Sequence, residues 1–295
     1  MRREPRAVLG VDVARDADGA PGASVRRCGI VGHPVAHSVS PVLYRAVFAQ
    51  AGLPWTYEAI DVAPGGLAAF VASLDEAWRG LSVTAPHKPD AFALGAPDEA
   101  SRLVGASNTL VFENGGRVLA QNTDVPGVVT ALAAHGIAQV DSAVVVGGGA
   151  TARSVVAGLA RIGLRHLVLQ VRDAARASAV VALTRELRVG VTVEEIGRRV
   201  PCDLVVSTLP ARAADPWAEA LGTAAPAVFD VAYDPWPTAL TKAAQNAGLV
   251  VVDGLDLLAG QAVDQMRLLC GADIGFDALR AVAVAELARR RTAAS

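Results

Sequence analysis

Lysine is almost missing from this chain of 295 residues, which has two lysines, Lys88 and Lys242, among its 27 lysine and arginine residues. Arginine carries nearly all of the positive charge, and its guanidinium keeps its proton in proteins. A lysine ammonium can release a proton, so a lysine retained in such a chain is a candidate acid or base. We interpret Lys242, on the polar face of an expected helix, as a surface residue. Lys88 ends the segment 82–88, which follows an expected strand, and is the candidate for chemistry.

Cysteine and long apolar runs are scarce as well. The three cysteines, Cys28, Cys202 and Cys270, are an odd and scattered set, which favours reduced thiols over a disulfide framework. No uninterrupted apolar run reaches the ~18 residues that suggest a membrane span. The first 23 residues carry charges throughout and lack the apolar centre of a signal peptide. We therefore expect a cytoplasmic protein that does not interact with membranes.

Neither sign of charge dominates, because the formal net charge is −2 and the pI is about 6.2. Such a chain has no basic field for nucleic acid or for an acidic membrane surface. Aromatic residues make up 4% of the chain and hydrophobic residues 52%. A sizeable core must therefore be built from alanine, valine and leucine, and the length permits two domains.

The first half of the chain predicts strands and helices in alternation, after a polar and turn-rich segment 1–25 that we expect to be a poorly ordered tail. Strands are expected over 27–32, 55–62 and 80–84, helices over 41–51 and 66–77, and a hairpin over 109–121 with its turn at 113–116.

The second half also alternates strands and helices, which predicts a parallel sheet covered on both faces. The expected strands are 142–146, 165–171, 191–196, 203–207, 227–230 and 250–252. Two helices, over about 255–271 and 276–290, follow the last strand. The expected fold class is therefore α/β.

A glycine-rich turn follows the first strand of the second half, with the spacing G-x-G-x-x-A, and a helix follows the turn. A strand, a glycine turn and a helix in this order point backbone N–H groups at a diphosphate. We therefore predict dinucleotide binding by the residues of this turn. They are Gly147, Gly148, Gly149, Ala150, Thr151 and Ala152.

The end of the next strand bears on the choice of cofactor. An acid there binds the ribose 2′-hydroxyl of NAD, whereas arginine accommodates the 2′-phosphate of NADP. Arg172 and Arg176 are about one helical turn apart and suit a phosphate, while Asp173 favours NAD. We favour NADP(H) as the cofactor.

Four short segments carry polar residues suited to a small substrate. They are 36–41 with Ser38 and Ser40, 83–88 with Thr84 and Lys88, 105–109 with Asn108, and 121–124, which ends in Asp124. Ser38 and Ser40 stand just before an expected helix, where their hydroxyls either cap the helix or bind a carboxylate.

In this order and spacing the segments resemble the shikimate dehydrogenase family, from about Arg27 to Leu287. The motifs that carry the resemblance are Ala36-His37-Ser38-Val39-Ser40-Pro41, Val83-Thr84-x-Pro86-x-Lys88, Asn108-Thr109, Asn122-Thr123-Asp124, Tyr233-Asp234-Pro235 and Asp253-Gly254-Leu255 followed by Gln261. The resemblance implies NADP-dependent, reversible reduction of 3-dehydroshikimate to shikimate in aromatic amino-acid biosynthesis.

The resemblance also implies how the chain is divided. It implies an α/β substrate-binding domain of residues 26–124, to which C-terminal helices in 255–295 return. A Rossmann-type domain with a doubly wound parallel sheet, residues 125–254, would bind NADP. The protein would act on its small-molecule substrate as a monomer or a homodimer, without nucleic acid.

Residue roles follow from the same resemblance. Ser38 and Ser40 would hold the substrate carboxylate, and Lys88 and Asp124 would form the catalytic pair. The ring hydroxyls would be bound by Thr84, Asn108, Asp124 and Gln261, with Tyr233 nearby, and Gly254 would lie where the nicotinamide meets the substrate. Hydride delivery to a ketone leaves an alkoxide, which a lysine ammonium can stabilise and protonate while a carboxylate orients it.

The chain departs from the common family pattern at three places, one of which is the turn Gly147-Gly148-Gly149-Ala150 where Gly-Ala-Gly-Gly is frequent. Many members carry asparagine at the position of Ser82, which leaves specificity for the ring substituents open. The frequent Asn-Arg-Ser/Thr at the cofactor ribose is here Val171-Arg172-Asp173, which leaves NAD open.

Other interpretations have weaker support. A quinate/shikimate or aminoshikimate dehydrogenase that uses NAD is the nearest alternative, and a non-catalytic ligand-sensing homologue would be indicated by loss of Lys88 or Asp124, which are both present. His33 and His37 are four residues apart, but Pro34 breaks a helix there and no third ligand is evident. We therefore predict no metal site.

Overall fold

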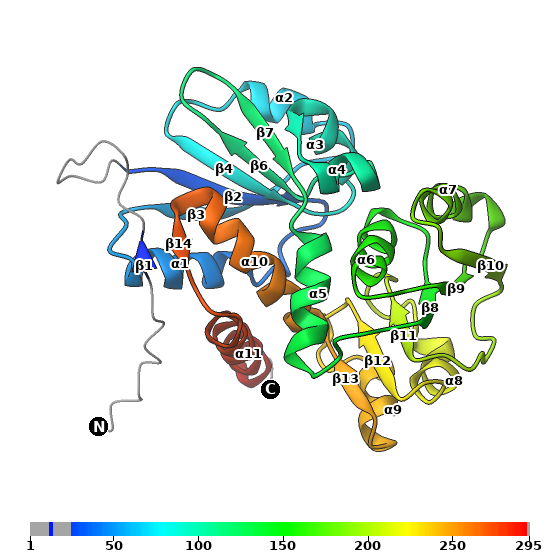
Figure 1. Cartoon of the computed structure of the whole chain (residues 1–295). Coiled ribbons are helices and arrows are strands. Elements are labelled where there is room, and N and C mark those ends of the chain that lie inside the picture. Colours follow the sequence, from blue (N-terminus) through cyan, green and yellow to red (C-terminus); the bar gives the residue numbers. More distant parts are fainter. Residues whose placement is uncertain (1–11, 14–24, 294–295) are drawn as a thin grey trace, which may run out of the picture. The chain divides into compact units, whose positions relative to one another are not determined.

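A computed structural model describes residues 12–13 and 25–293. They form two compact units, coloured along the sequence in Figure 1. Unit 1 comprises the described parts of Met1–Asp98, Ser107–Gln121 and Ala262–Ser295, and unit 2 comprises Glu99–Ala106 and Asn122–Gln261. Both units are α/β, as the sequence predicts.

Unit 1 is built on a six-stranded mixed sheet in the order β3-β2-β4-β6-β7-β5. The strands are β2 (Arg27–Gly32), β3 (Thr56–Asp61), β4 (Trp78–Val83), β5 (Ala96–Pro97), β6 (Thr109–Phe112) and β7 (Val118–Gln121). β2 is parallel to β3 and β4, β6 is antiparallel to β4, and β6 and β7 form a hairpin. The chain passes from β2 to β3 on one side of β2 and then from β3 to β4 on its other side. The direction of winding therefore reverses at β2.

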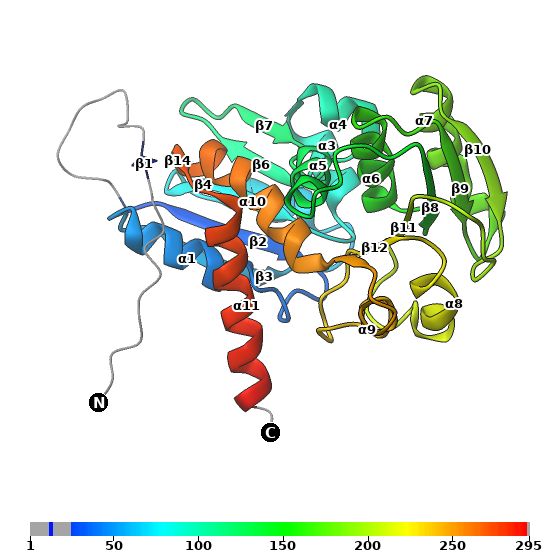
Figure 2. The same ribbon diagram turned by 60° about the horizontal axis from the view of Figure 1, so that its bottom comes forward.

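Helices cover both faces of this sheet (Figure 2). They are α1 (Ser40–Gln50), α2 (Leu67–Ala72), α3 (Lys88–Leu94), α11 (Phe276–Ala293) and, from Ala262 on, α10 (Gly254–Cys270). On one face Leu67 of α2 and Ala91 of α3 pack with Val31 of β2. Toward α1 and α11, the ring of Tyr44 stacks on Tyr57 of β3 with 4.2 Å between the ring centroids.

Unit 2 is a parallel sheet of six strands in the order β10-β9-β8-β11-β12-β13. The strands are β8 (Ser142–Val146), β9 (His166–Gln170), β10 (Gly190–Glu194), β11 (Leu204–Ser207), β12 (Ala227–Asp230) and β13 (Val250–Val252). In chain order this is 3-2-1-4-5-6, the doubly wound Rossmann arrangement that the sequence predicts. The winding reverses between β8 and β11, so their carboxyl ends form the switch point.

The central strands β8, β11 and β12 of unit 2 are buried on both faces, whereas the edge strands β10 and β13 are partly exposed. Val145 of β8 faces a core shared with Val128, whereas Val144 and Val146 face a second core shared with Leu240. Neighbouring strand residues point to opposite faces, which explains the uninterrupted valine run. The helices of unit 2 are α4 (Glu99–Val104), α5 (Asp124–Ala134), α6 (Ala150–Arg161), α7 (Ser178–Glu186), α8 (Ala218–Gly222), α9 (Ala239–Asn246) and the first part of α10.

Several elements differ from those expected. The helix expected over 66–77 ends at Ala72, because Asp75 accepts the N–H of Ala77 in a turn that leads into β4. Lys88, expected in a loop, is the first residue of α3, and the proline that follows it is typical of a helix start. Helices α4 and α5 are additional to those expected.

The borders of the units also differ from the expected division. Residues 99–106, 122–124 and 255–261 belong to unit 2. α4 contributes Val104 to the core of unit 2, and Asn122 Nδ2 donates to the carbonyl of Ala106 at 2.8 Å, so packing ties the first two segments there. The chain from Ala262 on belongs to unit 1, so the C-terminal helices return to the unit that holds the first strands.

Most of the expected tail, residues 1–25, lies outside the described residues. Within it, Asp12–Val13 forms the short strand β1, which pairs antiparallel with β14 (Ala272–Asp273). In the part of the chain that the structure describes, no helix combines the length and the apolar character needed to cross a membrane.

Candidate active site

The carboxyl ends of β2 and β4 carry five of the predicted residues of unit 1. β2 and β4 are neighbouring parallel strands at which the winding reverses, and small ligands bind outside such strand ends in α/β sheets. Ser38 and Ser40 follow β2, and Thr84 and Lys88 follow β4. Asn108 directly precedes β6, which is antiparallel to β4 and therefore begins at the same edge.

Ser38 and Ser40 lie at the start of α1. The Ser38 Oγ accepts the N–H of Ser40 at 3.2 Å, and both residues are buried. The N-cap residue, Val39, makes no side-chain hydrogen bond to the helix. The hydroxyl of Ser38 therefore provides part of the cap of α1. The positive end of the dipole of α1 lies beside the two hydroxyls, and this combination also suits a carboxylate.

Lys88 is positioned through its own backbone and through its neighbour. Its carbonyl accepts the N–H of Ser107 at 2.9 Å, which joins the start of α3 to the segment of Asn108. The residue is 9% exposed, and a lysine this deeply buried is rare unless it is paired. The preceding His87 is fully buried and donates from Nε2 to the carbonyl of Val62 at 2.7 Å. His87 therefore fixes the start of α3.

Thr84 lies directly against Gly32. A Cβ at Gly32 would be 2.4 Å from Cγ2 of Thr84, a distance that no real contact allows. The N–H of Thr84 donates to the carbonyl of Val31 at 2.8 Å. Glycine at the end of β2 therefore leaves room for Thr84. This allows segment 36–41, the serine-bearing segment, and segment 83–88, the lysine-bearing segment, to leave the sheet side by side.

Asn108 is held on both sides by backbone hydrogen bonds. Its N–H donates to Gln121 at 3.0 Å, and its carbonyl accepts the N–H of Val83 at 2.7 Å. The side-chain oxygen Oδ1 accepts the hydroxyl of Thr109 at 3.0 Å. Both the position and the orientation of this asparagine are thus defined within unit 1.

Ser82 belongs to a buried polar network. Its hydroxyl accepts a hydrogen bond from Tyr57 at 2.6 Å and donates one to Gln265 at 3.0 Å. Its single proton is donated within the protein, so Ser82 joins Tyr57 to Gln265 at the position where asparagine is expected from the family pattern.

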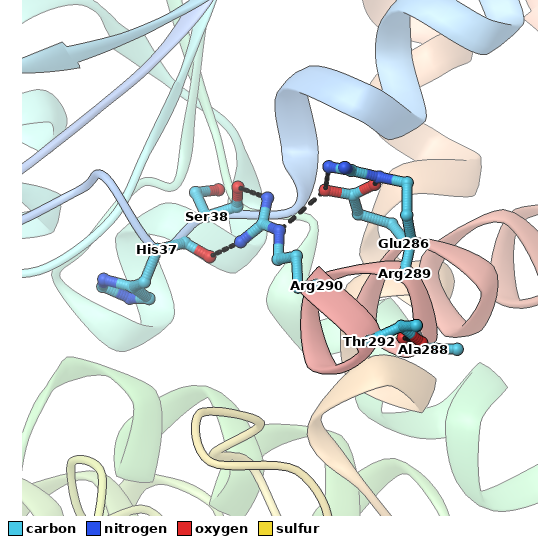
Figure 3. A network of polar contacts seen from close by, with 7 residues as sticks. All are labelled: His37, Ser38, Glu286, Ala288, Arg289, Arg290 and Thr292. Carbon is cyan, nitrogen blue, oxygen red and sulfur yellow. Dashed lines mark hydrogen bonds and ion pairs between the residues drawn. The ribbon is translucent and has the colours of Figure 1, made fainter. Parts of the chain in front are cut away.

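The last helix of unit 1 contacts the serine-bearing segment (Figure 3). Arg290 donates to the carbonyls of His37 at 2.7 Å and Ser38 at 3.0 Å, and its Nε donates to Glu286 at 2.7 Å. Arg289 donates two further bonds to the same carboxylate, which lower the pKa of Glu286 to about 2. The guanidinium of Arg290 therefore holds the backbone that leads to Ser40.

In unit 2, Gly147, Gly148 and Gly149 form the turn between β8 and α6. Gly147 has a φ of 110°, and a Cβ there would lie 2.4 Å from Oγ1 of Thr208. A Cβ at Gly148 would lie 2.2 Å from the carbonyl oxygen of Arg176. At Gly149, the N-cap of α6, a Cβ would meet nothing within 4 Å, and no side chain caps the helix there. This open helix N-terminus fits a diphosphate.

Ala150, Thr151 and Ala152 form the first turn of α6. Ala152 is fully buried in the core of unit 2, which is the close packing of helix on strand that the third position of the fingerprint requires. The N–H groups of this turn lie at the positive end of the helix dipole.

Arg172 and Arg176 are exposed beyond the end of β9. Between them, Asp173 accepts a backbone N–H at 2.9 Å and caps the short helix η1 (Ala174–Ala177). One oxygen of Asp173 is thereby used inside its own loop, which weakens the argument for NAD. A hollow of about 850 Å³ opens beside Arg172, between the ends of β9 and β10. Two guanidiniums next to a glycine turn fit the 2′-phosphate of NADP.

Tyr233 and Gly254 follow β12 and β13. A Cβ at Gly254 would lie 2.5 Å from the carbonyl oxygen of Val231, so α10 begins against the backbone that leads to Tyr233. Asp253 accepts two N–H groups of the first turn of α10, at 2.9 and 3.1 Å, and also the indole N–H of Trp236 at 2.8 Å. This cap fixes where α10 starts.

Asp124 and Gln261 lie on helices α5 and α10, which cross at two glycines. A Cβ at Gly127 would be 2.8 Å from the backbone nitrogen of Gln261, and one at Gly260 would be 2.5 Å from the carbonyl oxygen of Gly127. The two backbones are therefore in contact. Asp124 is 2% exposed and lies one turn before Gly127 on the same face of α5.

Asp230 ends β12 at the carboxyl edge of the sheet of unit 2. Burial raises the pKa of its carboxyl group to about 6, although Oδ2 accepts the hydroxyl of Thr238 at 2.8 Å. The carboxyl therefore titrates much closer to neutral pH than an exposed aspartate.

In unit 1, five predicted residues lie at one edge of the sheet. In unit 2, the glycine turn adjoins the backbone of Arg176. The pairing of Lys88 with Asp124, which lie in different units, stays a prediction.

Sequence reasoning does not find Gln265 or Arg290, and it gives Thr109 of the Asn108-Thr109 motif no role of its own. The available signal for Gln265 is that it lies one helical turn after Gln261 on the same helix. Within residues 12–13 and 25–293, no group of three or more His, Cys, Asp or Glu side chains is placed to hold a metal.

Known proteins match this arrangement over most of the chain. A family model described as the shikimate dehydrogenase substrate binding domain matches residues 30–110. The shikimate dehydrogenase (NADP(+)) of Methylobacterium radiotolerans is 41% identical over 249 residues, which cover 80% of this chain and 88% of that protein.

Solved structures agree in fold and in sequence. A shikimate 5-dehydrogenase from Mycobacterium fortuitum has a TM-score of 0.76 and 38% identity, and the match covers 88% of this chain and 97% of that one. The shikimate 5-dehydrogenase of Thermus thermophilus, in complex with NADP(H) and shikimate, has a TM-score of 0.76 and 29% identity, with 88% and 98% covered. On the identity and coverage of these relatives, the chain belongs to the shikimate dehydrogenase family.

Proposed function

We propose that this protein catalyses the reversible NADPH-dependent reduction of 3-dehydroshikimate to shikimate. The observation that carries the proposal is the set of residues at the carboxyl ends of β2 and β4, where a buried lysine, two serines at a helix N-terminus and an oriented asparagine share one sheet edge. The relative from Thermus thermophilus, whose structure holds NADP(H) and shikimate, supports the same substrate and cofactor.

Unit 2 would hold NADP(H). The glycine turn of Gly147, Gly148 and Gly149 would take the diphosphate at the N-terminus of α6, and Arg172 and Arg176 would take the 2′-phosphate. When bound, the cofactor supplies the hydride for the carbonyl carbon. Gly254, against the backbone of Val231, is the residue proposed to lie nearest the nicotinamide.

Unit 1 would bind and protonate the substrate. Ser38 and Ser40 would hold the carboxylate with the dipole of α1, which fixes the ring. As charge develops on the carbonyl oxygen, the ammonium of Lys88 would stabilise it and donate a proton from Nζ, with the carboxylate of Asp124 as its proposed partner. The ring hydroxyls are assigned to Thr84 and Asn108 of unit 1 and to Asp124 and Gln261 of unit 2, with Tyr233 of unit 2 nearby.

The deciding experiment is a steady-state assay of the purified protein with shikimate and with quinate, each with NADP and with NAD. The highest kcat/KM is expected for shikimate with NADP. A higher value for quinate with NAD would make the protein a catabolic quinate dehydrogenase. Binding of shikimate without any turnover would make it a ligand sensor.

The proposal extends to assembly and location. A monomer or homodimer in the cytoplasm, bound to its substrate and cofactor alone, is the expected form. Analytical ultracentrifugation and cell fractionation test these two points, and a larger oligomer or a membrane-bound fraction would contradict them.

A further inference from the structure

Gln265 is a buried carboxamide that none of the proposed roles uses. It lies on α10, is 2% exposed, and contacts residues far away in the sequence on three other elements of unit 1. Its Oε1 accepts the hydroxyls of Tyr44 and of Ser82, the latter at 3.0 Å. Its Nε2 donates to the carbonyl of Asn108 at 3.2 Å and to Oγ1 of Thr109 at 2.7 Å. Both lone pairs and both protons of the amide are therefore used.

The orientation of this amide is imposed by the backbone. The carbonyl of Asn108 can only accept a hydrogen bond, so the nitrogen of Gln265 must face it and the oxygen must face the two hydroxyls. Tyr44 remains a donor, because burial raises the pKa of its hydroxyl. Tyr57 in turn donates to Ser82 at 2.6 Å, which directs the proton of Ser82 toward Gln265.

The orientation is passed on to Asn108 through Thr109. The Thr109 hydroxyl accepts from Gln265, and its own proton is donated to Oδ1 of Asn108 at 3.0 Å. The carboxamide of Asn108 thus has its oxygen on the side of Thr109 and its Nδ2, with two donor protons, on the opposite side. Thr109 is fully buried in β6, so water does not compete for these bonds.

We propose that Gln265 and Thr109 are positioning residues that orient Asn108 so that its Nδ2 donates to a ring hydroxyl oxygen of the substrate. The inference rests on the proposed function, because it takes the substrate to be shikimate. It makes the buried relay from Gln265 through Thr109 the element that selects a hydroxyl at this point of the ring. Ser82 contacts only the oxygen end of Gln265 and is not part of this relay.

The matched variants are Thr109→Val, which keeps the shape and removes the hydroxyl, and Thr109→Ser, which keeps the hydroxyl. Thr109→Val is expected to raise the shikimate KM, and the shikimate Kd from calorimetry, by about tenfold, roughly the value of one hydrogen bond. Its kcat and its KM for NADP should change less than twofold. Thr109→Ser should restore the wild-type KM.

Ser82→Ala is the control, because it touches only the oxygen end of Gln265 and leaves the bonds through Thr109 to Asn108 in place. It should leave the shikimate KM within about twofold of wild type. A further readout uses 4-deoxy- and 5-deoxyshikimate: wild type should discriminate against one of them, and Thr109→Val should lose that discrimination.

The outcomes separate the two proposals. A wild-type protein that neither binds nor turns over shikimate ends the proposed function and this inference with it. A wild type that is active, with Thr109→Val unchanged or with Ser82→Ala impaired to the same extent, overturns the inference alone. Should Thr109→Val fail to fold, Gln265→Glu replaces it, since a carboxylate of the same shape cannot donate to Thr109 and should raise the shikimate KM in the same way.

Discussion

At position 88, the difference between lysine and arginine is whether the side chain can release a proton. Lys88→Arg keeps the positive charge but removes the proton donor, so we expect kcat to fall roughly 10²- to 10⁴-fold, the range typical of general acid catalysis. The shikimate KM should change little, because the serines proposed to hold the carboxylate stay in place.

Lys242→Arg is the matched control for this change. Lys242 is exposed on α9 in unit 2 and belongs to none of the proposed sites. Its variant should keep the wild-type kcat in the same steady-state assay. A Lys88→Arg enzyme with near wild-type turnover would show that the acid–base assignment is wrong.

Among the elements, the strands follow the sequence most closely. β8, β11 and β12 are mostly apolar runs bounded by turns, and such runs are typical of strands buried on both faces. The short helices α3 and α4 are less predictable, because their six or seven residues are too few to show a helical period. The proline beside Lys88 is the one local signal of α3.

The residues of the candidate site also differ in how far the sequence predicts them. Motif residues such as Ser38 and Gly147 stand next to the turn or helix start that explains them, so local patterns find them. Gln265 and Arg290 act on residues more than 150 positions away, and only the folded chain brings these partners together. A polar residue on a helix gives no sign in the sequence of which backbone it will contact.

Helix α11 provides a prediction at this scale, because it holds the backbone of a segment of the proposed substrate site. Arg290 donates to two carbonyls from two nitrogens of its rigid planar fork, a geometry that a lysine ammonium, with all its donors on one nitrogen, does not reproduce. Arg290→Ala is expected to raise the shikimate KM on the order of tenfold, with little change in kcat, because charge-assisted hydrogen bonds to the serine-bearing segment are lost. Arg290→Lys should recover only part of the loss.

Arg289→Ala is the control on the same helix. It removes two bonds to Glu286 but leaves those of Arg290 to the backbone of His37 and Ser38 (Figure 3). Its shikimate KM should stay near the wild-type value, and equal KM increases in both variants would mean that α11 acts only through general stability.

The effect of Arg290→Ala on KM should also be independent of pH over the working range. The hydrogen bond from Arg289 lowers the pKa of Glu286 from 4.5 to about 2. A carboxyl group with a lowered pKa contributes its stabilisation above its ordinary pKa and loses it as the pH falls through the folded value. Between about pH 6 and 9 Glu286 is therefore ionised, and the network is intact.

At the scale of the whole molecule, unit 2 carries the residues proposed for the cofactor and unit 1 those proposed for the substrate carboxylate and for its proton donor. This division can be measured without reference to how the units are placed. NADP should protect backbone amides of unit 2 at 147–152 and 172–176 from hydrogen exchange, because these N–H groups and arginines are the proposed phosphate contacts. Shikimate alone should protect amides near Ser38, Ser40 and Asn108 in unit 1. Ligand at about 100 times its Kd should add roughly 2.7 kcal/mol to the stability of the form that binds it.

NAD provides the control for that measurement, since it lacks the 2′-phosphate. At equal concentration it should protect 147–152 less than NADP does and leave 172–176 unchanged. Strong protection of 172–176 by NAD would mean that Asp173, and not the pair Arg172 and Arg176, determines the cofactor. Protection of the serine-bearing segment by NADP alone, with none at the glycine turn, would contradict the assignment of the two ligands to the two units.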